Sequence, residues 1–151
     1  MSCKDKHFNG NCVCDVVRFI NDLQDAVIED DNRCPESCLR PVLGATNGPC
    51  NKPNTRPFIL YTKDGSPFEA YFNSGSGSNC TSRIFRVESV DGCCAVLRVL
   101  QIEPGADTPN AICQYLAGEG NRRLVATSQC VVVDLDCFCA IQCLEDVFID
   151  L

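Results

Sequence analysis

Cysteine is the side chain in this sequence with the most evident chemistry. It accounts for 14 of the 151 residues, and four cysteines fall between Cys130 and Cys143, in a stretch that is also apolar and β-branched. Such a fraction is typical of small disulfide scaffolds or metal modules, yet a chain of this length buries enough surface to fold without them. The thiols therefore indicate a purpose other than replacing a missing core.

The stretch from Cys130 to Cys143 combines strand-forming residues with paired thiols. The run from Val131 to Val133 favours a pleated strand because β-branched side chains are stiff. Cys137 and Cys139 are two residues apart, so they would point to the same side of an extended chain. We therefore expect one face of this segment to carry two thiols.

A zinc site is the main alternative use of these thiols. Cys137-x-Cys139-x₃-Cys143 and Cys34-x₃-Cys38 could each supply thiolate ligands. Structural zinc sites commonly use Cys-x₂₋₄-Cys pairs, often with histidine, and the sole histidine lies near the N-terminus. We retain a cysteine-rich zinc-binding module as the alternative and predict no cofactor.

Catalysis has little support in the sequence. The single histidine, His7, lies in a short polar stretch and is a poor base for a cysteine nucleophile. There is no Cys-x-x-Cys, phosphate-binding or Gly-x-Ser-x-Gly motif. Asp134 and Asp136 alternate as paired catalytic carboxylates would, but two acids on the outward face of a strand are more often solvated. We predict that the chain is not an enzyme and has no catalytic residues.

Charge and hydropathy exclude several partners. The net charge of −7 disfavours binding to nucleic acid. No apolar run approaches the roughly 18 residues that suggest a membrane span, and the first residues lack the features of a secretory signal. We expect synthesis in a reducing cytoplasm without a signal peptide.

The elements that position the thiols follow from periodicity. Residues 1–11 are predicted to form a flexible arm, and residues 12–30 an amphipathic helix with apolar residues at steps of three and four. Residues 31–56 are a loop rich in proline and cysteine, and residues 57–151 a β core. Two hairpins are expected within that core, around Asp64-Gly65 and around Asp91-Gly92.

The later segments are less regular. Leu124–Ala126 and Cys130–Leu135 are predicted strands, Ala111–Leu116 is apolar but of undecided type, and Ala140–Ile149 is a closing strand or a short helix. With no linker or repeat evident, residues 12–151 are expected to form one cysteine-rich domain. The predicted fold is mainly β, a single antiparallel sandwich or barrel-like domain with one N-terminal helix.

Several long segments resemble a known family. The CotY/CotZ/ExsY family of bacterial spore-coat proteins, and its ExsY-type members most closely, is similar to this chain at Asn11–Cys14, Val17–Ile20, Pro57–Thr62, Pro67–Ala70, Ile84–Val90, Cys94–Leu100 and Val133–Leu144. The resemblance spans most of the chain and diverges at residues 31–54, 73–82 and 102–122.

The resemblance implies a structural role at the spore surface. Members of this family are made in the mother cell, assemble as oligomers into a hexagonal two-dimensional lattice, and become cross-linked through cysteine. For this chain it implies a homo-oligomer, a hexamer, within the exosporium basal layer or the outer coat or crust, in contact with other spore-surface proteins. The residues alone are compatible, since thiols kept reduced during synthesis can be oxidised after assembly.

We divide the cysteines by expected exposure. Those in the arm, the helix start and the loop are candidates for intermolecular disulfides: Cys3, Cys12, Cys14, Cys34, Cys38 and Cys50. Those in apolar, strand-like sequence are candidates for buried or intramolecularly bridged thiols: Cys93, Cys94, Cys113, Cys130, Cys137, Cys139 and Cys143. Cys80 is compatible with either group. Cys93 and Cys94, as neighbours on a strand, would face opposite sides.

Overall fold

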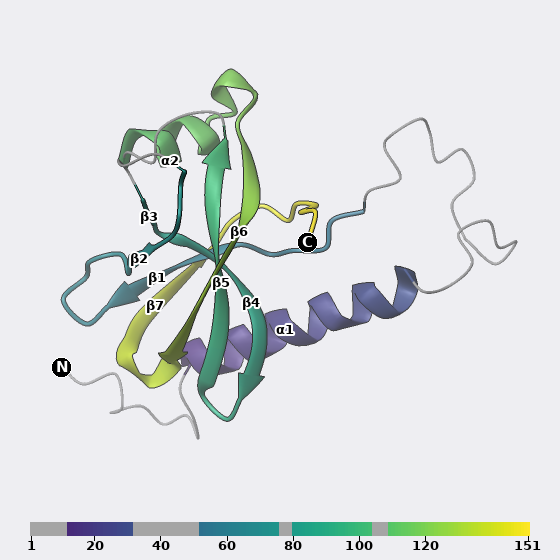
Figure 1. Ribbon diagram of the computed structural model, residues 1–151. Coiled ribbons are helices and arrows are strands. Elements are labelled where there is room, and N and C mark those ends of the chain that lie inside the picture. The colour runs from purple at the N-terminus through teal and green to yellow at the C-terminus, as the bar shows by residue number, and fades with distance from the viewer. Residues whose placement is uncertain (1–11, 32–51, 76–79, 104–108) are drawn as a thin grey trace, which may run out of the picture.

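A long helix and a curved antiparallel sheet make up most of the structure (Figure 1). The computed structural model describes residues 12–31, 52–75, 80–103 and 109–151; the predicted arm and most of the predicted loop lie outside these ranges. The helical elements are α1 (Cys12–Asp31), α2 (Pro109–Leu116) and the 3₁₀ turns η1 (Glu119–Asn121) and η2 (Leu135–Cys137). The strands are β1 (Phe58–Thr62), β2 (Ala70–Tyr71), β3 (Thr81–Ser82), β4 (Ile84–Asp91), β5 (Cys94–Glu103), β6 (Arg123–Asp134) and β7 (Phe138–Cys143).

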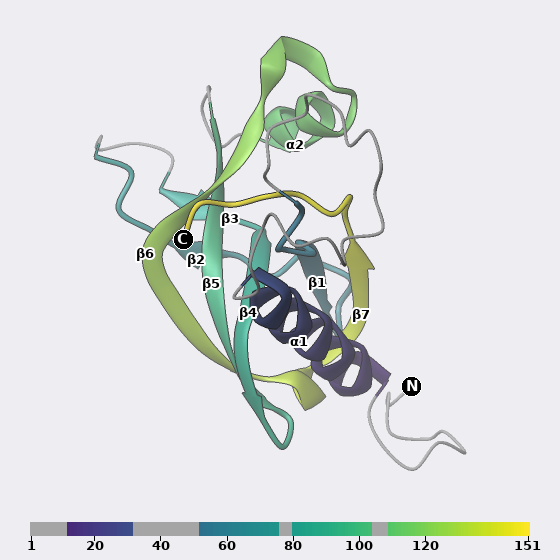
Figure 2. The same ribbon diagram turned by 90° about the vertical axis from the view of Figure 1, so that its right-hand side faces the viewer.

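The main sheet has five strands in the order β6-β5-β4-β1-β7, and all of its pairings are antiparallel. Figure 2 shows α1 on the concave side of this sheet, with β6 and β7 on either side of the helix. The sheet does not close into a barrel, so β6 and β7 remain edge strands. A mainly β fold with antiparallel sheets and one N-terminal helix is therefore confirmed, and the barrel-like alternative is not realised as a closed barrel.

Helix α1 forms where the periodicity predicts it. Val13, Val17 and Ile20 recur at steps of four and three and are buried against the sheet. Gln24 continues the same side of the helix; its side-chain amide donates to the Val87 carbonyl, 2.9 Å away. A buried polar side chain is tolerated there because it is hydrogen-bonded.

The hairpin around Asp91-Gly92 is confirmed, with β4 paired to β5 from Asp91↔Cys94 onward. Gly92 has a φ of 62°, a left-handed conformation that glycine adopts at no steric cost. The turn around Asp64-Gly65 also forms, but its hairpin is shorter than predicted. After a single bridge between Tyr61 and Pro67 the chain departs, and β2 pairs with β3 in a separate two-stranded sheet.

Three other segments refine the predictions. Leu124–Ala126 and Cys130–Leu135 do not form two strands, because β6 runs continuously from Arg123 to Asp134 and absorbs the irregular part as a register shift. Ala111–Leu116 belongs to α2. Of Ala140–Ile149, only the first part is strand, and its last part contributes an isolated bridge between Thr55 and Val147.

Two apolar cores lie on the sheet. The larger one joins α1 to the concave face through residues such as Phe58, Leu60 and Phe85. The smaller one joins α2 to strand residues that include Ile84 and Leu100. Among the described residues, no helix is long and apolar enough to cross a bilayer.

Candidate cross-linking site

Ten of the fourteen cysteines lie within the described residues, and these ten define the candidate site. The remaining four, Cys3, Cys34, Cys38 and Cys50, lie outside the described ranges, so their assignment to intermolecular disulfides stays a prediction.

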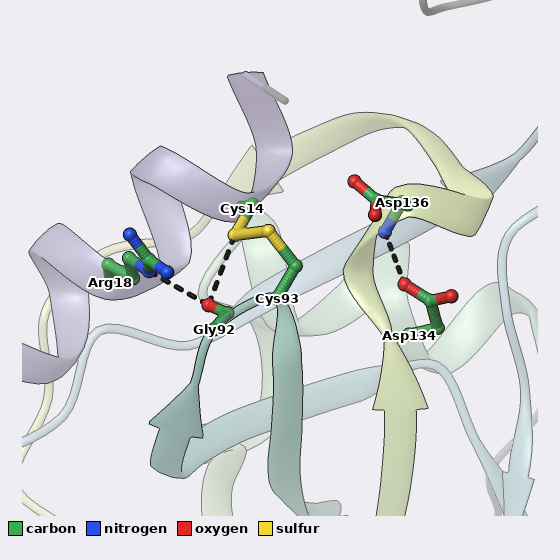
Figure 3. The surroundings of a disulfide bond; sticks show 6 residues. All are labelled: Cys14, Arg18, Gly92, Cys93, Asp134 and Asp136. Carbon is green, nitrogen blue, oxygen red and sulfur yellow. Dashed lines mark hydrogen bonds between the residues drawn. A yellow bond between two sulfur atoms is a disulfide. The ribbon is translucent and has the colours of Figure 1, made fainter. Parts of the chain in front are cut away.

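Cys14 and Cys93 form a disulfide that ties α1 to the turn between β4 and β5 (Figure 3). Their Cα atoms are 5.4 Å apart, although the residues are 79 positions apart in sequence. This bridge pairs Cys14, which we had expected among the intermolecular cysteines, with Cys93, one of the candidates for an intramolecular bridge. The reason lies in the helix: Cys14, three residues before the buried Val17, is only 1% exposed.

The backbone of Gly92 sits beside this bridge. Its carbonyl accepts a hydrogen bond of 2.8 Å from Nε of Arg18, one helical turn after Cys14. The same oxygen lies 3.4 Å from Sγ of Cys14. A disulfide sulfur has no proton, so this second contact is a hydrogen bond only when the bridge is reduced. Sequence reasoning missed Arg18, since a basic residue on a helix surface gives no signal of a distant acceptor.

One end of the molecule gathers six cysteines. We call it the thiol-rich end; it comprises the first turn of α1, the tip of the β4–β5 hairpin and the η2–β7 connection, which lie together in both views (Figures 1 and 2). Leu135 ties two of these parts together, because its amide donates to the Cys93 carbonyl at 2.8 Å. Its cysteines are Cys12, Cys14, Cys93, Cys94, Cys137 and Cys139.

The expected alternation of Cys137 and Cys139 along one strand is wrong. Cys137 ends the 3₁₀ turn η2, whereas Cys139 lies in β7, so the two do not share a continuous extended segment. The turn forms because the carboxylate of Asp134 accepts a hydrogen bond of 3.0 Å from the backbone amide of Asp136 (Figure 3). Asp134 therefore acts as a cap for η2.

Most cysteines expected to be buried are exposed. Burial is contradicted for the six that lie on edge strands, on turns or on outer faces: Cys94, Cys113, Cys130, Cys137, Cys139 and Cys143. Cys94 illustrates the cause, because it alternates with the fully buried Ala95 on β5 and so takes the outward side. Cys12 is exposed, as predicted, and Cys80 is half-buried. Intramolecular bridging of the six remains a prediction.

The exposed thiols project from separate parts of the fold. Cys130 lies on the edge strand β6, and Cys143 lies at the end of the opposite edge strand β7. Cys113 is on α2, which Figure 1 places at the other end of the molecule from the thiol-rich end. Reactive groups are thus available in several directions at once.

Cys143 has a distinct electrostatic environment. Burial raises its pKa, the nearby guanidinium of Arg56 lowers it, and the carboxylate of Asp146 raises it. Arg56 and Asp146 form a two-point ion pair, with Nε–Oδ1 and Nη2–Oδ2 distances of 2.7 and 2.9 Å. Burial is the largest of these three effects, so the pKa of Cys143 lies above its ordinary value.

The described residues contain no assembled zinc site. Across the described parts of the chain, no three side chains of histidine, cysteine, aspartate or glutamate are placed to hold a metal ion. Cys137, Cys139 and Cys143 thus do not form the predicted ligand set, and Cys34 and Cys38 lie outside the described residues.

Comparison with known proteins agrees with the resemblance. The family model for spore coat protein Z matches residues 1–146. Spore coat protein Z of Bacillus subtilis (strain 168) is 37% identical over 145 residues, which cover 89% of each chain. No solved structure matches the chain significantly. With a match over nearly its whole length and exposed thiols on several elements, the chain belongs to the spore coat protein Z family.

Proposed function

We propose that the chain is a structural, non-catalytic protein of the spore surface that assembles with itself into a two-dimensional layer locked by intermolecular disulfides. The observation that carries the proposal is the exposure of cysteines on α1, α2, β6 and β7, in a domain of the spore coat protein Z family. The building block we propose is a hexamer, within the exosporium basal layer or the outermost coat, docked to other spore-surface proteins.

The distribution of thiols supports a layer more than a closed oligomer. A subunit that is cross-linked at two sites produces only rings or filaments, and a sheet requires at least three connections per subunit. Cys113, Cys130, Cys143 and the thiol-rich end supply more than three, on separate elements. Exposed thiols are accessible to exchange and oxidation, whereas buried ones are inert.

The two strand edges offer non-covalent contacts that could precede the disulfides. Strands β6 and β7 each have a partner on one side only within the main sheet. An exposed edge presents unpaired backbone groups to another chain, which monomeric proteins suppress and an assembling protein can use. Val132, 66% exposed on β6, adds an apolar contact next to Cys130. Assembly by packing followed by oxidation would use the thiols that lie on these edges, such as Cys130 on β6 and Cys143 on β7.

Electron microscopy with redox control tests the proposal. Negatively stained purified protein should show ordered sheets that survive heating, and that dissociate when heat is combined with a reductant. Changing Cys130 and Cys143 to serine should make the sheets easier to dissolve by heat alone. The matched control is Gln129→Ser, an exposed change on the same strand that leaves all thiols intact. Protein that stays monomeric under every redox condition would overturn the proposal.

A further inference from the structure

We propose that the Cys14–Cys93 disulfide is a thiol–disulfide exchange centre whose substrate is an exposed thiol of a second copy of the chain. The incoming thiolate bonds to Sγ of Cys93, and Cys14 leaves as a thiolate. The identity of the substrate rests on the proposed assembly. The reactivity of the bridge does not depend on that assembly. The argument begins with which of the two sulfur atoms can be reached.

Access favours attack on Cys93. Cys14 is 1% exposed and packs in the larger core, so a nucleophile cannot approach it without opening α1. Cys93 is half-buried and lies in the turn of the β4–β5 hairpin, between Gly92 and Cys94, both of which are exposed. An incoming thiol therefore meets Cys93 first.

Attack on Cys93 makes Cys14 the leaving group. Cys14 lies in the first turn of α1, where the helix dipole favours negative charge, while its burial and the Gly92 carbonyl 3.4 Å away require that the departing thiolate be protonated at once. Arg18 adds a positive charge one turn further along, held at the Gly92 carbonyl beside the bridge. Asp15 and Arg18 are both exposed, so solvent screens their opposite charges alike. In exchange reactions the sulfur with the more stable thiolate leaves faster.

Cys93 lies in an acidic setting instead. Asp91 is two residues away, and Asp134 and Asp136 lie on the neighbouring segment in Figure 3. Negative charges disfavour a thiolate on Cys93, so cleavage in the opposite sense is disfavoured. The same acids attract a cationic incoming thiol and repel an anionic one, which gives the site a selectivity that can be measured.

The exchange step balances without an oxidant. A new bond forms between the incoming sulfur and Cys93, the Cys14–Cys93 bond breaks, and its electron pair stays on Cys14. The proton that the incoming thiol has lost is replaced on Cys14, so one intramolecular disulfide becomes one intermolecular disulfide. The Cys14 thiol then has an acceptor in place, the Gly92 carbonyl 3.4 Å away. Each subunit would thus carry the oxidising equivalent for one of its own cross-links.

The first experiment tests the bridge with small thiols on the full-length oxidised protein. Cysteamine, which is cationic, and 3-mercaptopropionate, which is anionic, are reacted at matched thiolate concentrations, and the mixed disulfide is located by peptide mass spectrometry. We expect the adduct on Cys93 and a free thiol on Cys14, with cysteamine about fivefold faster at low ionic strength and the difference reduced by salt. An adduct found mainly on Cys14, or a reaction that requires global unfolding, would overturn the proposal.

The second experiment tests the substrate with two variants of the full chain. In oxygen-free buffer the oxidised chain should form the disulfide from Cys93 to a second copy, whereas Cys14→Ser, which has no bridge to exchange, should form none. In Cys93→Ser the buried Cys14 should form no such bond. Cys94→Ser is the matched control, because it removes an exposed neighbour and leaves the bridge intact. Equal intermolecular linkage through Cys14 and Cys93 would contradict the assignment.

The two experiments separate this inference from the proposed function. Adducts of small thiols on Cys93, together with assemblies that contain disulfides but none through Cys93, would overturn the second copy as substrate. Protein that never assembles but still forms the Cys93 adduct would overturn the layer and the second copy, and would leave the reactivity of the bridge established.

Discussion

The helix-covered face of the sheet and its two edges use cysteine in opposite ways. Under α1, Cys14 is buried and bonded within the chain, and the surrounding core excludes water. At the edges, Cys130 and Cys143 face solvent on strands that have a neighbour on one side only. The same side chain therefore stabilises one subunit in the first region and is available to other subunits in the second.

This difference does not follow from the neighbouring residues in sequence. Cys130 is followed by three valines, which is a more apolar setting than that of Cys14, yet Cys130 is exposed. The exposure of a cysteine depends on whether another element covers the side of the strand or helix on which it lies. Helix α1 covers Cys14, and no described element covers the outer side of β6 at Cys130.

Breaking the helix-covered face should have the largest effect on stability. Ile20→Ala removes a fully buried side chain between α1 and the sheet, and we expect the free energy of unfolding to fall by about 2–5 kcal/mol. Urea denaturation followed by circular dichroism measures the change. The control is Phe19→Ala on the same helix, where the side chain is 56% exposed, with an expected change within about 0.5 kcal/mol. Equal losses in the two variants would show that α1 does not cover the sheet as described.

Removing the bridge should have the next largest effect. Cys14→Ser abolishes a link that closes a loop of 79 residues, and we expect a loss of about 2–4 kcal/mol relative to the oxidised protein. Serine can still donate to the Gly92 carbonyl, so the loss reports mainly the covalent bond. Cys12→Ser, two residues away and exposed, should change stability by less than about 0.5 kcal/mol. If adding a reductant destabilises Cys14→Ser as much as the original protein, the bridge is not the cause.

Much of the fold was predictable because local patterns and tertiary packing agree. The three- and four-residue spacing of Val13, Val17 and Ile20 specifies one buried side of α1, and Asp91-Gly92 specifies a tight hairpin. The shortened hairpin after Gly65 was not predictable in the same way. Its second strand contains Pro67, which cannot donate to a ladder, and the pairing of β2 with β3 depends on distant residues.

The sequence predicted that cysteines form the candidate site, but it did not predict which cysteines pair or how they are arranged. The number of cysteines indicated cross-linking. Cys14 lies three residues before Val17, on the buried side of the helix, but its place near the helix start led us to expect exposure. The partner of Cys14 could not be inferred, because 79 residues separate it from Cys93 and only the packing of α1 on the hairpin brings them together. The 3₁₀ turn that separates Cys137 from Cys139 arises from one capping contact of Asp134.

A smaller effect is expected from the ion pair beside the β7 edge. The hydrogen bond from Arg56 holds the pKa of Asp146 below its ordinary value, so the pair stabilises the fold above the pKa of an unfolded aspartate. That contribution is lost as the pH falls through the lowered pKa. Because both side chains are partly exposed, Asp146→Asn should cost less than about 1 kcal/mol at neutral pH. In urea melts the difference between the two proteins should shrink steadily as the pH is lowered from 7 through the ordinary pKa of an aspartate.

The finest comparison concerns the reactivity of an edge thiol. Burial raises the pKa of Cys143, so its thiolate fraction near neutral pH is smaller in the folded chain than in the unfolded one. Its alkylation by iodoacetamide, followed by mass spectrometry, should therefore be slower in native protein than in urea. Asp146→Asn should accelerate it and Arg56→Gln should slow it, because the two charges act on the thiolate with opposite signs. If both variants change the rate in the same direction, access and not charge controls this thiol, and the edges would then differ from the helix-covered face by exposure alone.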